Sequence, residues 1–109
     1  MNASKTPAKH RALPANRLIV ERVQTGVRIE KRLLKVLKGL AEYHDMTLGD
    51  LLEGIVLHAF DGKAPFSSQS LTRIAQLKEI YGLDLNSSAS HLLTEKRPAS
   101  KLKSMEATR

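Results

Sequence analysis

Gln24, Gly26 and Arg28 form the most suggestive chemical pattern in the chain, because they alternate with apolar or β-branched residues. A strand would place these three on one face and their neighbours Val23, Thr25, Val27 and Ile29 on the other. A guanidinium such as that of Arg28 can donate two hydrogen bonds to a guanine edge, or it can pair with a phosphate. The pattern therefore predicts a polar strand face that contacts nucleic acid, with a merely solvated charge as the alternative for Arg28.

No catalytic or metal-binding pattern accompanies this stretch. No two of the four histidines have the i, i+4 spacing of a helical metal site. The serines before His91 lack a glycine-flanked nucleophile elbow, and the chain has no phosphate loop, paired-carboxylate motif or dinucleotide fingerprint. We therefore expect a protein that is not an enzyme and that uses no metal or cofactor.

Charge is distributed unevenly along the chain, whose formal net charge is +7. Residues 1–38 hold ten Lys and Arg against two acids, residues 39–95 hold three against eight, and residues 96–109 hold five against one. This distribution favours a polyanionic partner for the amino-terminal part. A tail that only improves solubility is the simpler alternative.

Length and composition limit the class of protein. A chain of 109 residues has room for one small domain with tails, and the absence of cysteine excludes disulfides and thiolate chemistry. Hydrophobic residues make up 41% of the chain and aromatic residues only 4%, a profile typical of helical packing. No apolar run approaches the roughly 20 residues of a membrane span, so we expect a soluble cytoplasmic protein without a membrane partner.

Helical periodicity follows the predicted strand. Apolar residues at spacings of three and four predict one helix over residues 30–44 and another over residues 47–61. A third helix is expected to begin after a cap at Ser67 or Ser68, to carry Leu71, Ile74, Leu77 and Tyr81 on its apolar side, and to stop at Gly82. A short element is expected around residues 86–90. We expect the third helix to pack on the second, because the second carries an apolar stripe wider than one contact needs.

The predicted strand has no partner strand within the chain, and an isolated strand leaves its backbone N–H and C=O groups without hydrogen bonds. The economical solution is the same strand of a second copy, paired antiparallel about a two-fold axis above the helices of both chains. Such a ribbon fits the major groove of duplex DNA. The pattern therefore predicts a homodimer.

Over about residues 23–60 the chain resembles the ribbon-helix-helix DNA-binding proteins typified by the Arc and MetJ repressors. The resemblance rests on Val27-Arg28-Ile29-Glu30 leading into Leu33-Leu34-Lys35-Val36-Leu37 and Leu40-Ala41, and on Met46-Thr47-Leu48 opening Leu51-Leu52. It implies a mainly α fold, with one short strand paired between the two chains of a homodimer. An additional carboxyl-terminal helix extends this chain beyond the shared unit.

Site residues follow from the resemblance. It implies base contacts at Gln24, Gly26 and Arg28, although glycine offers no side chain for readout. Phosphate contacts are expected at the start of the second helix and from basic residues, at Thr47, Leu48, Gly49, Lys31, Lys5, Lys9 and Arg11. Lys31, Arg32, Lys35 and Lys38 form a basic face on the first helix. Such a face is usually just exposed to solvent, and contact of some of these residues with the DNA backbone is the alternative. The implied dimer core consists of Val27, Ile29, Leu33, Val36, Leu37, Leu40, Leu48, Leu52 and Val56.

We expect a disordered basic arm over residues 1–16, a ribbon-helix-helix domain over 17–61, a helical extension over 62–95 and a disordered basic tail over 96–109. The leading hypothesis is a repressor-like transcriptional regulator that reads double-stranded DNA as a homodimer, with tetramers on DNA as an extension. One alternative is an antitoxin that captures a toxin or other protein through residues 63–95. Another is a protein-interaction module that does not bind DNA.

Overall fold

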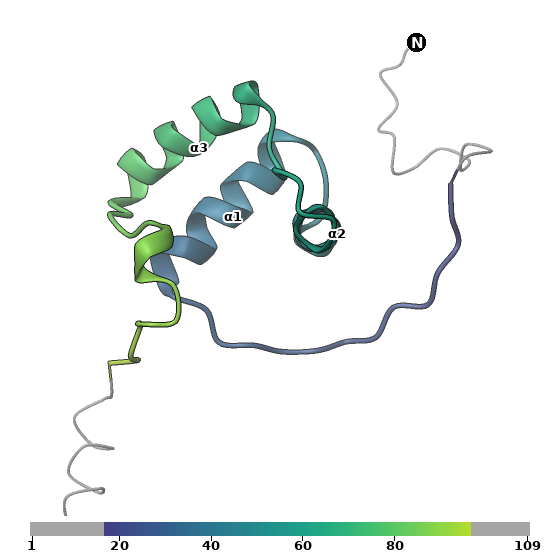
Figure 1. Ribbon diagram of the computed structural model, residues 1–109, viewed down its shortest axis with the longest axis horizontal. Helices are drawn as coiled ribbons and strands as arrows, with labels where there is room; N and C mark the ends of the chain where they lie inside the picture. Colours follow the sequence, from purple (N-terminus) through teal and green to yellow (C-terminus); the bar gives the residue numbers. More distant parts are fainter. Residues whose placement is uncertain (1–16, 97–109) are drawn as a thin grey trace, which may run out of the picture.

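The computed structural model describes residues 17–96 and is mainly helical. Its helices are α1 (Lys31–Tyr43), α2 (Leu48–Phe60) and α3 (Ser68–Tyr81), followed by a single 3-10 turn, η2 (Ser87–Ala89) (Figure 1). Residues 17–30 have no regular secondary structure and lead into α1 as an elongated segment. The three predicted helices and the short element near residue 88 are confirmed.

Each helix begins at a side chain that accepts a hydrogen bond from a backbone N–H of the helix's own first turn. The three pairs are Glu30 with Leu33 at 2.8 Å, Thr47 with Asp50 at 3.0 Å and Ser67 with Ser70 at 3.2 Å. These bonds satisfy N–H groups that helix geometry leaves without partners. At the other end of α3, Gly82 has a φ of 67°, in the left-handed region that glycine adopts without strain.

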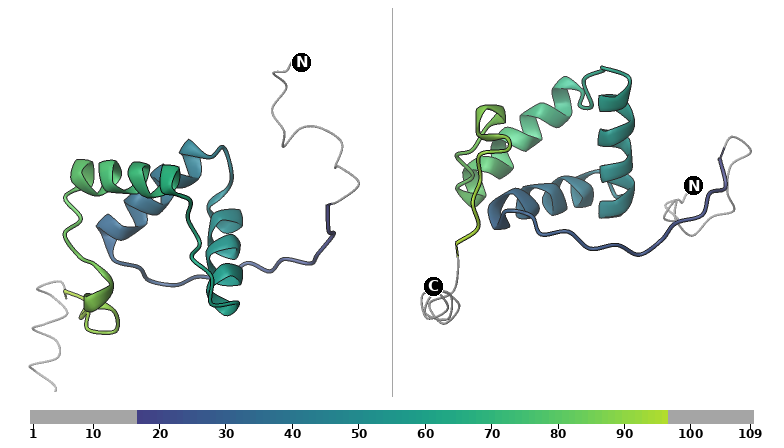
Figure 2. Two further views of the ribbon diagram at one scale, coloured as in Figure 1. Left: turned by 45° about the horizontal axis from the view of Figure 1, so that its top comes forward. Right: turned by 60° about the horizontal axis from the view of Figure 1, so that its bottom comes forward.

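Helices α1 and α3 form an antiparallel pair (Figure 2). Near the start of α1, Arg32 Nη1 donates to the Gly82 carbonyl at 3.0 Å, and just after its end His44 Nε2 lies 2.8 Å from Ser70 Oγ. The buried apolar core comprises Val36, Leu40, Ala41, Leu51, Leu77 and Leu83. The centre of this core is Leu40, whose exposed fraction is only 1%.

Helix α2 crosses the α1–α3 pair steeply (Figure 2), and most of its residues are exposed. It is rich in apolar residues, yet Leu51 is its one buried residue. Val56, Leu57 and Phe60 are 43%, 63% and 80% exposed. A helix that is apolar on most of its surface is normally buried on several sides, so this single chain leaves α2 without the cover that its composition requires.

The expectation that the third helix packs on the second was wrong. Within the described residues, α3 packs along α1, and its backbone does not come close to that of α2. The physical reason lies on α1, where Gly39 has no side chain and lets Leu77 of α3 approach closely. The stripe on α2 that we expected α3 to cover is therefore only partly covered. Leu51 is in the core and Ile55 packs against it, whereas Ala59 is exposed.

The predicted strand over residues 23–29 stays a prediction. In the described part of the chain no segment pairs with these residues as a strand, and the pairing that we expect involves a second copy. None of the described helices combines the length and the apolar character needed to cross a lipid bilayer.

Candidate nucleic-acid interface

The segment that precedes α1 carries exposed cations together with exposed apolar side chains. The side chains of Arg22 and Arg28 are 62% and 82% exposed. Between them, Val23 and Val27 are 86% and 75% exposed. Figure 1 shows this segment running apart from the α1–α3 pair before it enters α1. One short stretch thus offers apolar groups that could pack against another surface and guanidinium groups that could bind an anion.

The guanidinium of Arg28 forms a bidentate contact, the type of contact that arginine also makes with a guanine base. Its Nε donates to Glu95 Oε1 at 2.9 Å, and its Nη2 donates to Glu95 Oε2. A guanidinium uses the same fork of two donors on the O6 and N7 atoms of guanine. A carboxylate from the segment after η2 therefore occupies the donors that we expect to read DNA.

Arg22 joins the same segment to α2. Its Nε and Nη2 donate to the two carboxylate oxygens of Glu53 at 2.7 and 2.8 Å, and these hydrogen bonds lower the pKa of Glu53. Our sequence reasoning missed Arg22 as a site residue. The signal was present, since Arg22 lies two residues before Gln24 and a strand would place both on one face.

Gln24 and Gly26 are both exposed on this segment. A Cβ added to Gly26 would meet no atom within 4 Å, so nothing in the described chain requires glycine at this position. With Arg28, they are the three residues that the sequence assigned to base reading. The structure places all three on accessible backbone.

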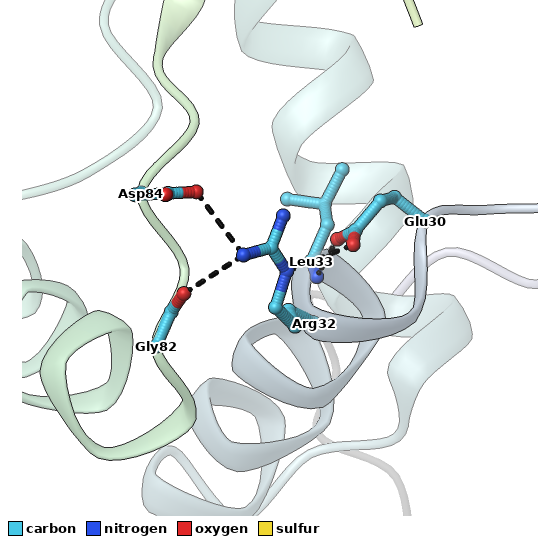
Figure 3. Close-up of polar contacts among 5 residues, drawn as sticks. All are labelled: Glu30, Arg32, Leu33, Gly82 and Asp84. Carbon is cyan, nitrogen blue, oxygen red and sulfur yellow. Dashed lines mark hydrogen bonds and ion pairs between the residues drawn. The ribbon is translucent and has the colours of Figure 1, made fainter. Parts of the chain in front are cut away.

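The basic residues of α1 divide into structural and accessible ones. Arg32 donates to the carbonyl of Gly82 and lies 3.1 Å from Asp84 through Nη1, while its Nε donates to Glu30 at 2.9 Å (Figure 3). Lys35 lies over the Tyr81 ring at 5.6 Å. Arg32 therefore ties the start of α1 to the end of α3, a role that sequence reasoning missed, whereas Lys31 remains exposed.

The start of α2 brings together the residues expected to hold a phosphate. Thr47 caps the helix, and the N–H groups of Leu48 and Gly49 precede the first residue that can bond within the helix. A Cβ on Gly49 would meet no atom within 4 Å, so the backbone there is open to approach. Asp50 lies in the same turn and opposes an anion by its charge.

His44, the carboxyl-terminal cap of α1, and His58 of α2 both make structural contacts. His44 bonds to Ser70 and so links α1 to α3, and His58 Nδ1 lies 2.7 Å from the Gly54 carbonyl one turn earlier. Among residues 17–96 no group of three or more His, Asp or Glu side chains is arranged to hold a metal ion. Lys5, Lys9 and Arg11, expected to contact phosphates, lie outside the described residues, as does the tail after Lys96.

The residues expected to form a dimer core fall into three groups in this single chain. Val36 and Leu40 are already buried, and both belong to the core that contains Leu77 of α3. Partly buried members are Ile29, Leu37, Leu48 and Leu52, and exposed members are Val27, Leu33 and Val56. Helix α3 thus packs against part of the α1 face that the resemblance assigned to a second copy.

Comparisons with models of protein families, with curated proteins and with solved structures found no match. Function is therefore inferred from the residues and their geometry.

Proposed function

We propose that this protein is a homodimeric ribbon-helix-helix DNA-binding regulator of transcription. Residues 23–29 of two copies pair antiparallel, and the ribbon enters the major groove. The observation that carries this proposal is the exposure of the segment before α1, in which Val23 and Val27 are uncovered and an exposed Arg28 directly follows Val27. Pairing with a second copy gives the backbone of this segment its hydrogen-bond partners and the valines their cover.

Helix α2 supports the dimer independently of the ribbon. Its side chains at Leu57 and Phe60 lie largely in solvent in the single chain, and Val56 is also exposed. Burial of one large apolar side chain stabilises a protein by about 1.5–3 kcal/mol, so covering several of them favours association. The packing of α3 on α1 argues against the antitoxin alternative, because a segment that folds only on capturing a toxin has no such core of its own.

DNA reading follows from the polar side of the ribbon. Gln24, Gly26 and Arg28 face the bases, with Arg28 exchanging Glu95 for guanine. Because the two-fold axis presents each residue twice with opposite polarity, the preferred site is an inverted repeat. Phosphates are held by Lys31, by the start of α2 and by the basic arm over residues 1–16.

Selection of genomic fragments on the purified protein would identify the preferred site, and binding to it can then be measured against salt. If the dimer neutralises about 6–8 phosphates, log K should fall against log salt with a slope of roughly −5 to −7. Arg28→Ala should lose on the order of 10- to 100-fold on the preferred duplex and little on a scrambled one. Gln24→Ala should act in the same direction, more weakly.

Deletion of residues 1–16 is the matched control, because it should weaken binding to all sequences alike and flatten the salt slope. Equal losses by Arg28→Ala on both duplexes would make Arg28 a phosphate contact. Absence of binding by the wild type at low salt would overturn the proposal and favour a protein-interaction module.

A further inference from the structure

An apolar groove of about 260 Å³ lies between α1, α3 and the chain that follows α3. Its apolar lining includes Leu33, Leu37, Phe66, Ile74, Leu83 and Leu85. Lys78 and Asn86 are its polar members. Leu33 and Leu37 also belong to the face of α1 that the resemblance assigns to the dimer core, so the groove continues the proposed ribbon interface toward α3.

The chain's own α2 does not fill this groove. Its backbone does not come close to that of α3, and no residue of α2 is among those that line the groove. Its last two turns carry Val56, Leu57 and Phe60, and Phe60 follows the other two at the spacings of three and four that share one helix face. The single chain thus leaves two apolar surfaces exposed, the carboxyl-terminal end of α2 and this groove. The end of α2 does not occupy the groove of its own chain.

We propose that the carboxyl-terminal half of α2 from a second copy occupies this groove. In the two-fold dimer each chain donates its α2 and receives the partner's, so both contacts form at once. This inference rests on the homodimer of the proposed function. It assigns a role to the carboxyl-terminal extension, because α3 and residues 83–85 then supply one wall of the dimer interface.

Charge complementarity favours α2 as the occupant over another apolar segment of the chain. Lys78 lines the groove, whereas α2 ends with Asp61 as its carboxyl-terminal cap. The carboxyl end of a helix also carries partial negative charge on its last carbonyl groups. Lys78 in the groove therefore attracts the carboxyl-terminal end of α2 from the second copy, the end that carries Phe60.

Cross-linking can test this placement directly, because the chain contains no cysteine. A Phe60→Cys protein with one tag is mixed in turn with Leu33→Cys, Ile74→Cys and Leu85→Cys proteins with another tag, and each mixture is oxidised. A disulfide needs Cα atoms roughly 4.4–6.8 Å apart, so at least one pair should cross-link between chains in high yield. Ile80→Cys is the control, since Ile80 is 68% exposed and outside the groove.

Sedimentation of Phe60→Asp provides a second measurement. Phe60 is 80% exposed in the single chain, so the substitution should leave the circular dichroism of the helices unchanged. We expect it to raise the dimer dissociation constant at least tenfold, whereas Ile80→Asp should not. Unchanged dimer affinity in Phe60→Asp without any cross-link above the Ile80 control would overturn this inference and leave the DNA-binding homodimer standing. A wild-type protein that is monomeric at all concentrations would overturn both.

Discussion

Gly39 of α1 faces Leu77 of α3 so closely that a Cβ on residue 39 would lie 2.9 Å from Leu77 Cδ2. Leu77 is buried in the same core as Leu40. Real Cβ atoms essentially never approach a carbon atom that closely, so a side chain at residue 39 would push α3 away or force Leu77 into another rotamer. Because Gly39 has no side chain, α3 can pack closely against α1 at this point.

Gly39→Leu should therefore destabilise the protein, although leucine is the better helix former. Overpacking costs about 1–3 kcal/mol, which exceeds the gain of roughly 0.5–1 kcal/mol from replacing a helical glycine. Urea unfolding measures the difference. Gly54→Ala is the control, because a Cβ there meets no atom within 4 Å and the same propensity gain should appear unopposed. Equal stabilisation by both variants would contradict the close contact.

Two adjacent basic residues should separate stability from DNA binding. Arg32→Lys should lower the midpoint of thermal unfolding, because lysine lacks the planar fork that reaches Glu30 and the end of α3 together. Lys31→Ala should leave that midpoint unchanged and weaken binding to all DNA sequences. The pair is tested by calorimetry and by DNA titration of both variants. A normal midpoint for Arg32→Lys would show that the link to Gly82 does not stabilise the fold.

Glu95→Gln should strengthen DNA binding. In the wild type, Arg28 must break its bidentate contact with the Glu95 carboxylate before it can bind guanine. The neutral amide of glutamine holds the guanidinium less strongly, so this cost is smaller in the variant. We expect a gain of severalfold on the preferred duplex. In an Arg28→Ala background the gain should disappear, which a double-mutant cycle measures. Glu79→Gln changes net charge equally from the exposed side of α3, so a similar gain there would mean a general charge effect.

The Glu30 carboxylate should make the free energy of unfolding fall as the pH is lowered into the acid range. The backbone N–H of Leu33 and then the guanidinium of Arg32 hold the pKa of Glu30 below its ordinary value. Because the pKa of Glu30 is lower in the folded state, its carboxylate stabilises the fold fully at pH values above the unfolded-state pKa of about 4.3. This stabilisation is lost as the pH falls through the folded-state pKa. Glu30→Gln should therefore be less stable than the wild type at pH 7, with the difference shrinking in acid. A stability difference between Glu30→Gln and the wild type that stays constant from pH 7 into acid would contradict this role of Glu30.

Unfolding should depend on protein concentration. If the ribbon and α2 are covered only in the dimer, the midpoint of thermal unfolding rises with concentration by mass action. Calorimetry over a hundredfold concentration range measures this shift. A constant midpoint with a monomeric mass in sedimentation would contradict the intertwined dimer.

The helices and their ends could be predicted from the sequence because their signals are local. Apolar spacing marks α1, α2 and α3, Thr47 and Ser67 cap the next turn, and Gly82 supplies a left-handed residue where α3 ends. Each of these signals acts within a few residues along the chain. The alternation around Gln24, Gly26 and Arg28 is equally local, and it marked the segment that the structure leaves exposed.

The docking of those helices was decided only in three dimensions. The wide apolar stripe of α2 led to the prediction that α3 packs on α2. In the structure α3 packs on α1 instead, where Gly39 leaves room for Leu77. The same docking brings Arg32 to Gly82, and the return of the chain brings Glu95 to Arg28. Such contacts join segments some fifty or more residues apart. They depend on how side-chain volumes fit between helices, which periodicity along one helix does not specify.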